Sequence, residues 1–513
     1  MKTNDILNAL SDVDDKYKKE AFEENADNIF VKNKNKGGIS RIFKYVMSAA
    51  AILALCAFAV FIGVYSRRDN IAASMLEKGA DIPHEFSKLE VEKTTYTNDA
   101  KKIDSVKVEI PVCDITPAGA EDVDPENADY YMLGSTCIIN IDNIRWGENS
   151  EWNNKSYLEK TENGKVVTKY NMPDLGVDWQ FYSDHKELGD GLFLFGGARY
   201  ILMKEEYEFS TFAVMFNEDG TVRWFTKHKD PVGTAPEELL QAYLEDGKIY
   251  VVTAAMEDLF TKSENYTEEM PSYIADDMCR ELIITVYDEQ TGEILSRKSA
   301  ATELRTTILD IHCLGKTKYG FVIYILQKDD KYDPCYVLLD YNGNVAAVCR
   351  YGTDFEFCSA ESINGQIYLS GKYMPDGKNM YPHTDHKLIS SPSWIYEHKY
   401  SSIRENSAAY NKYKNETKAI LMVCDAELTP TKAYTQSGSY GGILRVENNR
   451  LFWDAAEITN AQAYDGTADY TAAIIIAHAK TLIINEKGAL EARADSDNVY
   501  AMEGYKMSPS DMK

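Results

Sequence analysis

Residues 282–293 read LIITVYDEQTGE, in which the apolar run 282–287 leads into a turn that closes at Gly292. Glycine or asparagine supplies the positive φ that tight hairpin turns require. Turns of this kind recur about every 50 to 85 residues. They are Glu162-Asn163-Gly164, Asn217-Glu218-Asp219-Gly220, Glu289-Gln290-Thr291-Gly292, Asn342-Gly343, Glu427-Leu428-Thr429 and Glu486-Lys487-Gly488. The sequence therefore predicts six repeated β-hairpins.

Further strand-like segments surround these turns. Apolar runs precede every turn after the first, at 212–216, 282–287, 336–341, 419–425 and 481–485. Paired strands come ahead of several of them, at 241–244 with 248–253, 355–360 with 366–370, and 444–447 with 450–453. Short apolar runs bounded by turn residues are typical of strands. Each unit is therefore predicted to hold four strands.

Six units of four strands predict an all-β domain, a β-propeller of six blades. One four-stranded blade cannot cover both of its faces, whereas a closed ring of blades can. The first unit begins near Tyr130 and lacks a strand, and the segment 498–502 (NVYAM) is expected to complete it and close the ring. Seven blades are possible if residues 105–127 contribute one, and two stacked β-sandwiches are the alternative fold.

The units resemble the quinoprotein-like and WD-type propeller repeats. In the quinoprotein repeat an Asp-x-x-Thr-Gly turn follows an apolar strand, as in Asp288-Glu289-Gln290-Thr291-Gly292, and the turn ending at Gly220 with Trp224 is a looser copy. Quinone-dependent dehydrogenases of that fold carry adjacent cysteines and acidic calcium ligands. No two cysteines are adjacent in this chain. We therefore expect no quinone and no other cofactor.

The segment 45–65 reads YVMSAAAILALCAFAVFIGVY, which contains 21 residues and no charge. A helix of that length spans about 30 Å, the thickness of the hydrocarbon core of a bilayer. More basic residues precede the segment than follow it closely, which places the N-terminus in the cytoplasm. The expected organisation is a cytoplasmic helical head (1–44), a retained transmembrane helix (45–65), an extracytoplasmic stalk and lead-in (66–127) and the propeller (128–513).

The head contains apolar residues at helical spacing, namely Ile6, Leu10, Val13 and Tyr17. Taken alone, this pattern fits a helix pair that folds on a partner as well as an idle tether. The run LSDVDDKY (10–17), with Glu20-Ala21 and a basic stretch before the apolar span, resembles the N-terminus of membrane-anchored anti-sigma-factor-like proteins of Gram-positive bacteria. The resemblance implies a cytoplasmic sigma factor as partner, although residues 1–44 lack the His and Cys ligands of zinc-type anti-sigma domains.

Charge and cysteine usage restrict the outer part. The chain has a net charge of −26; residues 1–68 carry a net charge of +3, so residues 69–513 carry about −29. Such an acidic domain does not bind nucleic acid through its general field. Of nine cysteines, Cys56 lies in the apolar span, and the remaining eight permit disulfides without indicating any pair.

An insertion of some 45 residues, 374–418, interrupts one unit. Exposed aromatic side chains suit sugar or peptide recognition, and long insertions on rigid scaffolds often carry binding function. The candidate ligand-binding residues are Tyr381, His383, His386, Trp394, Tyr396 and Tyr400. The alternative is an excursion packed against the outside of the ring. The His383/His386 pair, spaced i, i+3, and the acidic insertion 256–278 are both interpreted as solvated loops, so no metal site is expected.

No nucleotide-binding, nucleophile-elbow, zinc-protease or EF-hand motif is present, and no catalytic residue is predicted. The favoured hypothesis is a single-pass membrane sensor whose propeller binds an extracellular protein or carbohydrate while its head contacts a cytoplasmic partner. The alternative is a cell-surface scaffold with a purely anchoring N-terminus. An enzyme acting on a cell-wall or carbohydrate substrate is the weakest hypothesis, because no carboxylate pair or nucleophile stands out.

Overall fold

The structure, a computed structural model, divides into two compact units, residues 1–75 and 76–513. It describes residues 77–120, 130–131, 144–148, 156–162, 165–173, 179–201, 207–229, 237–258, 277–306, 311–327, 333–375, 401–403, 414–465 and 471–507. Within these ranges no helix is long and apolar enough to cross a membrane. The predicted helix at 45–65 and the head residues Ile6, Leu10, Val13 and Tyr17 lie outside the described residues.

Apart from one helical turn at 414–416, the described secondary structure is strand, in six successive groups that we call blades. Blades one and two hold β5 (Ile144–Glu148), β6 (Ser156–Glu162) and β7 (Lys165–Asn171), then β8 (Trp179–Leu188), β9 (Gly191–Ile201), β10 (Tyr207–Asn217) and β11 (Val222–Lys229). Blades three and four hold β12 (Glu237–Glu245), β13 (Lys248–Asp258), β14 (Asp277–Asp288) and β15 (Ile294–Thr306), then β16 (Ile311–Thr317), β17 (Gly320–Gln327), β18 (Asp333–Leu339) and β19 (Val345–Arg350). Blades five and six hold β20 (Phe355–Ile363), β21 (Gln366–Tyr373), β23 (Lys418–Cys424) and β24 (Pro430–Ser437), then β25 (Ser439–Glu447), β26 (Arg450–Asp465), β27 (Thr471–Ile484) and β28 (Leu490–Met507), with β22 (Ser401–Ile403) beside β26.

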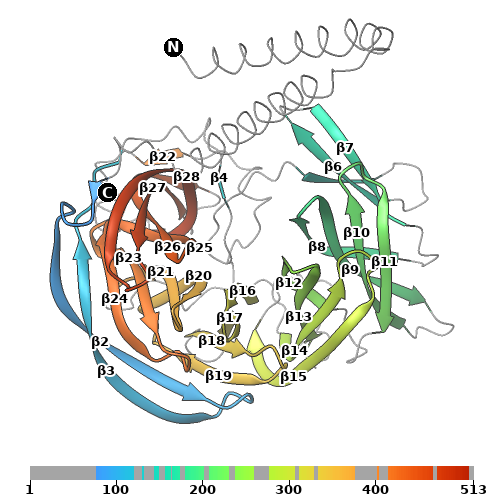
Figure 1. The fold of residues 1–513 in the computed structure, drawn as a ribbon, viewed down its shortest axis with the longest axis horizontal. Coiled ribbons are helices and arrows are strands. Elements are labelled where there is room, and N and C mark those ends of the chain that lie inside the picture. Colours follow the sequence, from blue (N-terminus) through green and yellow to red (C-terminus); the bar gives the residue numbers. More distant parts are fainter. Residues whose placement is uncertain are drawn as a thin grey trace, which may run out of the picture. The chain divides into compact units, whose positions relative to one another are not determined.

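The blades follow one another in chain order around a common centre within the second unit (Figure 1). In each of blades two to six, consecutive strands pair antiparallel. The first strand of each of blades two to five packs against the first strand of the blade after it. Radial packing of this kind is that of a β-propeller, not of two stacked sandwiches. The propeller prediction is confirmed, and each predicted turn joins the last two strands of a blade.

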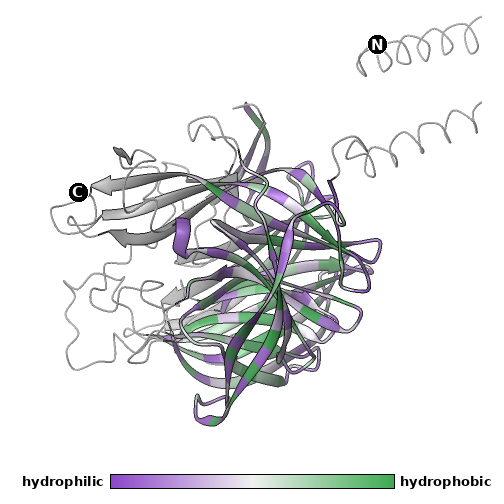
Figure 2. Cartoon of the chain, turned by 90° about the vertical axis from the view of Figure 1, so that its left-hand side faces the viewer, coloured by the Kyte–Doolittle hydropathy of each residue, from purple (hydrophilic) through white to green (hydrophobic). Residues whose placement is uncertain are grey.

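The hydrophobic core lies between the blades. Five clusters of buried side chains each join one blade to the next, from Leu158 and Phe212 between blades one and two to Tyr368 and Trp453 between blades five and six. Hydrophobic residues lie mainly along the strands and hydrophilic residues mainly in the turns (Figure 2). This division follows from a blade with two covered faces and exposed ends.

The turns have a shared local chemistry. The Asp288 carboxylate accepts hydrogen bonds from the backbone N–H of Gln290 and Thr291, and Gly292 has a φ of +70°. Asp340, Asp425 and Asn485 accept in the same way at the turns of blades four to six. An Asx side chain that mimics the backbone is a standard way to start a turn.

The N-terminal part of the second unit corrects the expectation of a stalk. Residues 77–116, called the strap, contain β1 (Glu77–Lys78), β2 (His84–Tyr96) and β3 (Lys102–Ile115). β1 pairs with β28, β2 with β19, and β3 runs parallel to β24. The strap therefore links the outer strands of blades four, five and six. The segment 105–115 adds no seventh blade, because it forms one strand of this hairpin.

The closure of the ring also differs from the prediction. The segment 498–502 continues β28 and pairs with β27, so it belongs to blade six and does not complete blade one. Val499 and Tyr500 also pair in parallel with β4 (Tyr130–Tyr131), where the first blade was expected to begin. Blade six retains this segment because the buried Asp454 carboxylate accepts hydrogen bonds from Asn498 Nδ2 (2.6 Å) and Tyr500 Oη (2.7 Å).

Candidate functional site

The predicted ligand-binding residues Tyr381, His383, His386, Trp394, Tyr396 and Tyr400 lie outside the described residues, within 376–400. The described strand ends nevertheless locate the two insertions. Both join the second strand of a blade to the third, since β13 ends at Asp258 before β14 and β21 ends at Tyr373 before β23. They therefore leave the propeller at one end, which we call the loop end. The other end carries the turns within the hairpins, and we call it the turn end.

A hollow of about 470 Å³ opens at the turn end, across blades three, four and five. We call it the turn-end hollow. It is built where β12 and β20 end, where β13 begins, and at the turns after β16 and β18. Its lining residues are Tyr243, Glu245, Tyr250, Lys316, Thr317, Lys318, Tyr341, Glu361 and Ser362. No sequence argument had singled out any of them.

Lys316 lies in a cradle formed by two blades. Its ammonium group forms an ion pair with Glu245 and is 5.1 Å from the ring centroid of Tyr250 and 6.0 Å from that of Tyr341. The side chain of Lys316 is only 17% exposed. A carboxylate together with the faces of aromatic rings stabilises an ammonium ion through charge and ring quadrupole.

The tyrosine rings around the hollow are held in place. Tyr341 Oη donates to the carbonyl of Thr317 at 2.5 Å, and its ring meets Phe321 edge-on at 5.3 Å. Tyr243 stacks on Phe321 at 5.7 Å, and its hydroxyl lies 3.7 Å from Cys313 Sγ. Burial raises the pKa of both phenols above the usual range, so both stay protonated.

Glu361 contributes a carboxyl group whose burial is compensated by few hydrogen bonds. It accepts one hydrogen bond, from the backbone N–H of Ser362 at 3.1 Å. Burial raises the pKa of Glu361 to about 7, although the nearby charge of Lys316 acts in the opposite direction. At neutral pH the group therefore exists in both protonation states, as functional carboxyl groups often do.

A close backbone contact positions Glu361. A Cβ atom on Gly315 of β16 would lie 1.8 Å from the carbonyl oxygen of Ala360 on β20, so only glycine permits the approach. The Ser362 hydroxyl then accepts from the backbone N–H of Lys318 at 2.6 Å. These contacts bring the ends of the first strands of blades four and five together.

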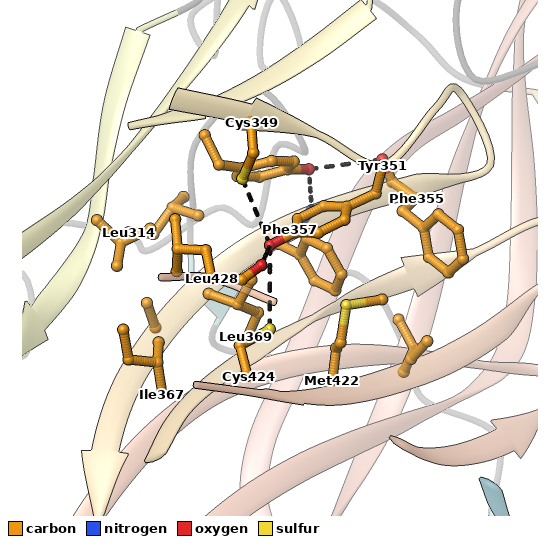
Figure 3. Close-up of a cluster of buried hydrophobic side chains, with 14 of the residues drawn as sticks. Leu314, Cys349, Tyr351, Phe355, Phe357, Ile367, Leu369, Met422, Cys424 and Leu428 are labelled. Atoms are coloured by element: carbon orange, nitrogen blue, oxygen red, sulfur yellow. Dashed lines mark hydrogen bonds between the residues drawn. The ribbon is translucent and has the colours of Figure 1, made fainter. Parts of the chain in front are cut away.

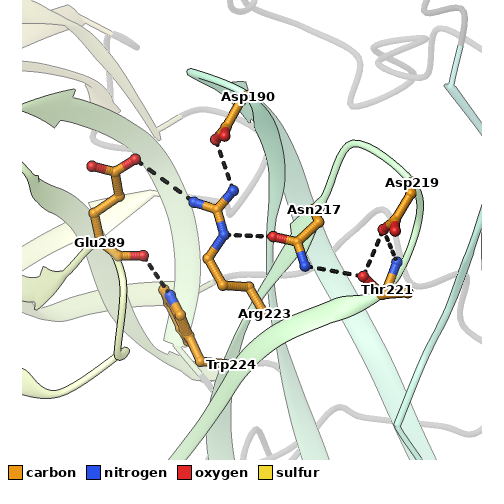
Figure 4. Close-up of polar contacts among 7 residues, drawn as sticks. All are labelled: Asp190, Asn217, Asp219, Thr221, Arg223, Trp224 and Glu289. Atoms are coloured by element: carbon orange, nitrogen blue, oxygen red, sulfur yellow. Dashed lines mark hydrogen bonds and ion pairs between the residues drawn. The ribbon is translucent and has the colours of Figure 1, made fainter.

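A second hollow, of about 490 Å³, lies at the turn end of blade two and is lined by Asp190, Asn217, Glu218, Asp219 and Arg223. Arg223 lies in its wall and is fully engaged there: the guanidinium donates to Asp190 at 2.7 Å and to the Asn217 side chain at 2.8 Å, and it lies 3.7 Å from Glu289 of blade three (Figure 4). The adjacent Trp224 donates from Nε1 to the carbonyl of Glu289 at 2.8 Å. This network joins two blades and is a structural contact.

The cysteines in the described part of the chain form no site. All seven that the structure describes are free thiols, five of them buried. Between blades four and five, the hydroxyl of Tyr351 lies 3.5 Å from Cys349 Sγ and 3.9 Å from Cys424 Sγ and donates to the carbonyl of Leu428 at 2.6 Å (Figure 3). Burial raises the pKa of Cys349 to about 11, so its thiol stays protonated and unreactive.

The signal for the turn-end hollow in the sequence is faint. Tyr243 and Glu245 come just before the turn Asp246-Gly247, and Tyr341 belongs to the turn that closes at Gly343. Aromatic and acidic residues flanking turns of successive units meet when the units form a ring. The raised pKa of Glu361 results from burial in the folded protein, which the local sequence around Glu361 does not indicate.

No protein-family model matches the chain, and no curated protein is similar enough to count as a relative. Solved structures that are similar include BamB from Moraxella catarrhalis (11% identity, TM-score 0.25, covering 71% of this chain and 97% of that one). The quinohemoprotein alcohol dehydrogenase from Comamonas testosteroni shares 11% identity with a TM-score of 0.27, covering 74% of this chain and 75% of that one. The cobalt-substituted apocarotenoid oxygenase of Synechocystis shares 8% identity with a TM-score of 0.26, covering 83% and 96%. Likenesses this weak carry no functional argument, and the fold rests on the strand pairing described above.

Proposed function

We propose that the chain is a single-pass membrane sensor whose extracytoplasmic propeller binds a ligand in the turn-end hollow. The observation that carries the ligand-binding part is this hollow, in which blades three and four place tyrosine rings around a carboxyl group of blade five whose pKa is about 7. Burying a carboxyl group destabilises the folded state unless hydrogen bonds or an opposite charge compensate for the loss of water. Such a group, exposed to a concave space, is a candidate for recognition.

The membrane and signalling parts of the proposal rest on the sequence. The uncharged segment 45–65 supplies the anchor, and the head resembles that of anti-sigma-factor-like proteins, with Ile6, Leu10, Val13 and Tyr17 as the contact residues. The anchor is tested by fractionating cells and treating intact cells with an external protease. Recovery of the chain in the soluble fraction refutes the anchor, as does protection of the acidic C-terminal region from the protease in intact cells.

The partner is tested with the full-length chain. We expect cytoplasmic sigma factors to co-purify with it, and the paired substitution Leu10→Asp and Val13→Asp to abolish the association. The paired substitution Asn4→Asp and Asn8→Asp, which adds the same two negative charges away from the apolar face, serves as the control. If no sigma factor co-purifies and deletion of residues 2–40 leaves transcription unchanged, the scaffold with an anchoring N-terminus is the better description.

We propose binding rather than catalysis at the hollow. Of its two carboxyl groups, Glu245 is already engaged by Lys316, which leaves Glu361 without a second free carboxylate for acid–base work. Turnover of a cell-wall or carbohydrate substrate by the purified protein, lost on a single substitution in the hollow, would instead establish an enzyme.

A further inference from the structure

We propose that the turn-end hollow binds the primary ammonium group of its ligand, with Glu361 as the counter-ion. The inference rests on the proposed function only in taking this hollow as the ligand site. It names the chemistry that the hollow recognises, an alkylammonium such as an amine-bearing peptide or amino sugar would present.

The hollow already holds one ammonium group. Lys316 is bound by a carboxylate and by the rings of Tyr250 and Tyr341, contributed by β12, β13 and the turn after β18. This intramolecular contact shows that the walls suit an alkylammonium, whose methylene chain lies along the rings while the charge meets a carboxylate.

Glu361 lacks the ion-pair partner that Glu245 has. Lys316 pairs with Glu245, and no described residue forms an ion pair with Glu361. Burial favours the protonated form of this carboxyl group more strongly than the nearby charge of Lys316 opposes it, which gives the direction of its pKa shift. A ligand that carried a positive charge would supply the missing partner.

The walls of the hollow also favour an amine. The hydroxyls of Tyr243 and Tyr341 are directed to Cys313 and to the Thr317 carbonyl, so these side chains present mainly rings to the hollow. Ring surface suits the carbon chain of an amine. A neutral polyol would instead need several hydrogen-bonding groups that these engaged hydroxyls do not offer. The two chemistries thus give different expectations.

Binding is expected to be linked to a proton. An ammonium ligand binds the ionised form of Glu361, so a protonated site must first release its proton. With a pKa of about 7, roughly a tenth of the sites are ionised at pH 6 and nine tenths at pH 8. The apparent affinity should therefore rise about tenfold from pH 6 to pH 8.

The test is calorimetric titration of the full-length protein in detergent with n-pentylamine and, separately, with 1-pentanol. The two probes have the same carbon chain, and the amine remains an ammonium at both pH values. At pH 8 we expect the amine to bind at least tenfold more tightly than the alcohol. At pH 6 the amine should bind about tenfold more weakly than it does at pH 8. Equal binding of both probes would show a neutral site and overturn the inference, as would no amine binding at millimolar concentration.

Two variants, each with its own control, assign the effect. Glu361→Gln should lose the amine preference and its pH dependence, while Glu427→Gln, an exposed carboxylate at the same end of blade five, should leave both unchanged. Tyr250→Leu should weaken amine binding and Tyr250→Phe should retain it, which separates the ring from its hydroxyl. Unchanged binding in Glu361→Gln would overturn the assignment. The results of these binding experiments do not depend on those of membrane fractionation or sigma-factor co-purification. The amine-binding inference and the membrane-sensor proposal can therefore be refuted independently.

Discussion

The contact between Trp224 of blade two and Gly292 of blade three gives a quantitative test of how neighbouring blades hold together. Trp224 is 6% exposed, its ring stacks on Tyr287 at 5.6 Å, and its Nε1 donates to the carbonyl of Glu289 at 2.8 Å. A Cβ atom on Gly292 would lie 2.4 Å from Cδ2 of Trp224, so the indole packs directly on the glycine backbone. The ring and the glycine should therefore be energetically coupled.

The expected magnitudes follow from these contacts. Trp224→Ala removes a buried indole and its hydrogen bond, which should lower the free energy of unfolding by about 3–5 kcal/mol. Trp224→Phe keeps most of the packing and should cost about 1–2 kcal/mol. Gly292→Ala should cost about 2–4 kcal/mol beside the intact indole, from the clash and from φ of +70°. When Gly292→Ala is combined with Trp224→Ala the clash is gone, and about 1 kcal/mol of backbone strain should remain.

The assay is urea unfolding of the four proteins in this double-mutant cycle, followed by far-UV circular dichroism. The coupling energy between the two substitutions should be about 1–3 kcal/mol in the direction of rescue. Phe225→Ala, a neighbour on β11 that is 37% exposed, is the control and should cost clearly less than Trp224→Ala. Costs that add to within about 0.5 kcal/mol would refute the claim that the indole packs on Gly292.

Three further predictions concern buried charges. Asp454→Asn removes a carboxylate that accepts three side-chain hydrogen bonds and should lower the free energy of unfolding by about 2 kcal/mol in urea titration, whereas the exposed Asp495→Asn should change it by under about 0.5 kcal/mol. The raised pKa of Glu361 means that the folded state holds its proton more tightly, so stability falls as pH rises. The free energy of unfolding of Glu361→Gln, relative to wild type, should therefore increase by about 2.5 kcal/mol between pH 5 and pH 8 in the same titration, and no increase would contradict the burial of Glu361. Arg493→Met removes the hydrogen bonds to Glu77 (2.8 and 2.5 Å) and should raise hydrogen exchange at the start of the strap at least tenfold, while unchanged protection would show that strand pairing alone holds it.

The repeated turns could be predicted because their chemistry is local. At Asp288 and Asp340 the side chain that starts the turn and the glycine that ends it are three or four residues apart, so both are visible in the sequence. Such signals also give the number of units. They do not say which strand lies beside which across the ring.

The strap could not be predicted for this reason. β3 pairs in parallel with β24, and Asp114 contacts Thr435, which is 321 residues away. β2 reads HEFSKLEVEKTTY, whose many charges suit an exposed outer strand and also a solvated stalk. The burial of Val91 against blades four and five distinguishes the two.

The error at the C-terminus has a similar origin. The segment 498–502 has the pattern of a new strand, but β27 is 14 residues long and pairs with β28 near both of its ends, from Leu490 to Met507. Asp454 then fixes Tyr500 from the neighbouring strand, an effect of tertiary packing. The turn-end hollow was missed because its residues come from three blades and span positions 243 to 362.

The fifth blade shows why the turn position matters more than the residue type found there. Where the other turns have glycine, this one has Leu428 at a φ of +60°, which costs about 1–2 kcal/mol for a side chain of this kind. Leu428 is fully buried, and Tyr351 of the preceding blade donates to its carbonyl at 2.6 Å. Burying a leucine contributes about 1.5–3 kcal/mol, enough to offset the strain. Trp224 at Gly292 and Tyr351 at Leu428 are thus two forms of one contact, in which each blade covers the last turn of the next. The turn that identifies a unit in the sequence is also the point where that unit is held by its neighbour.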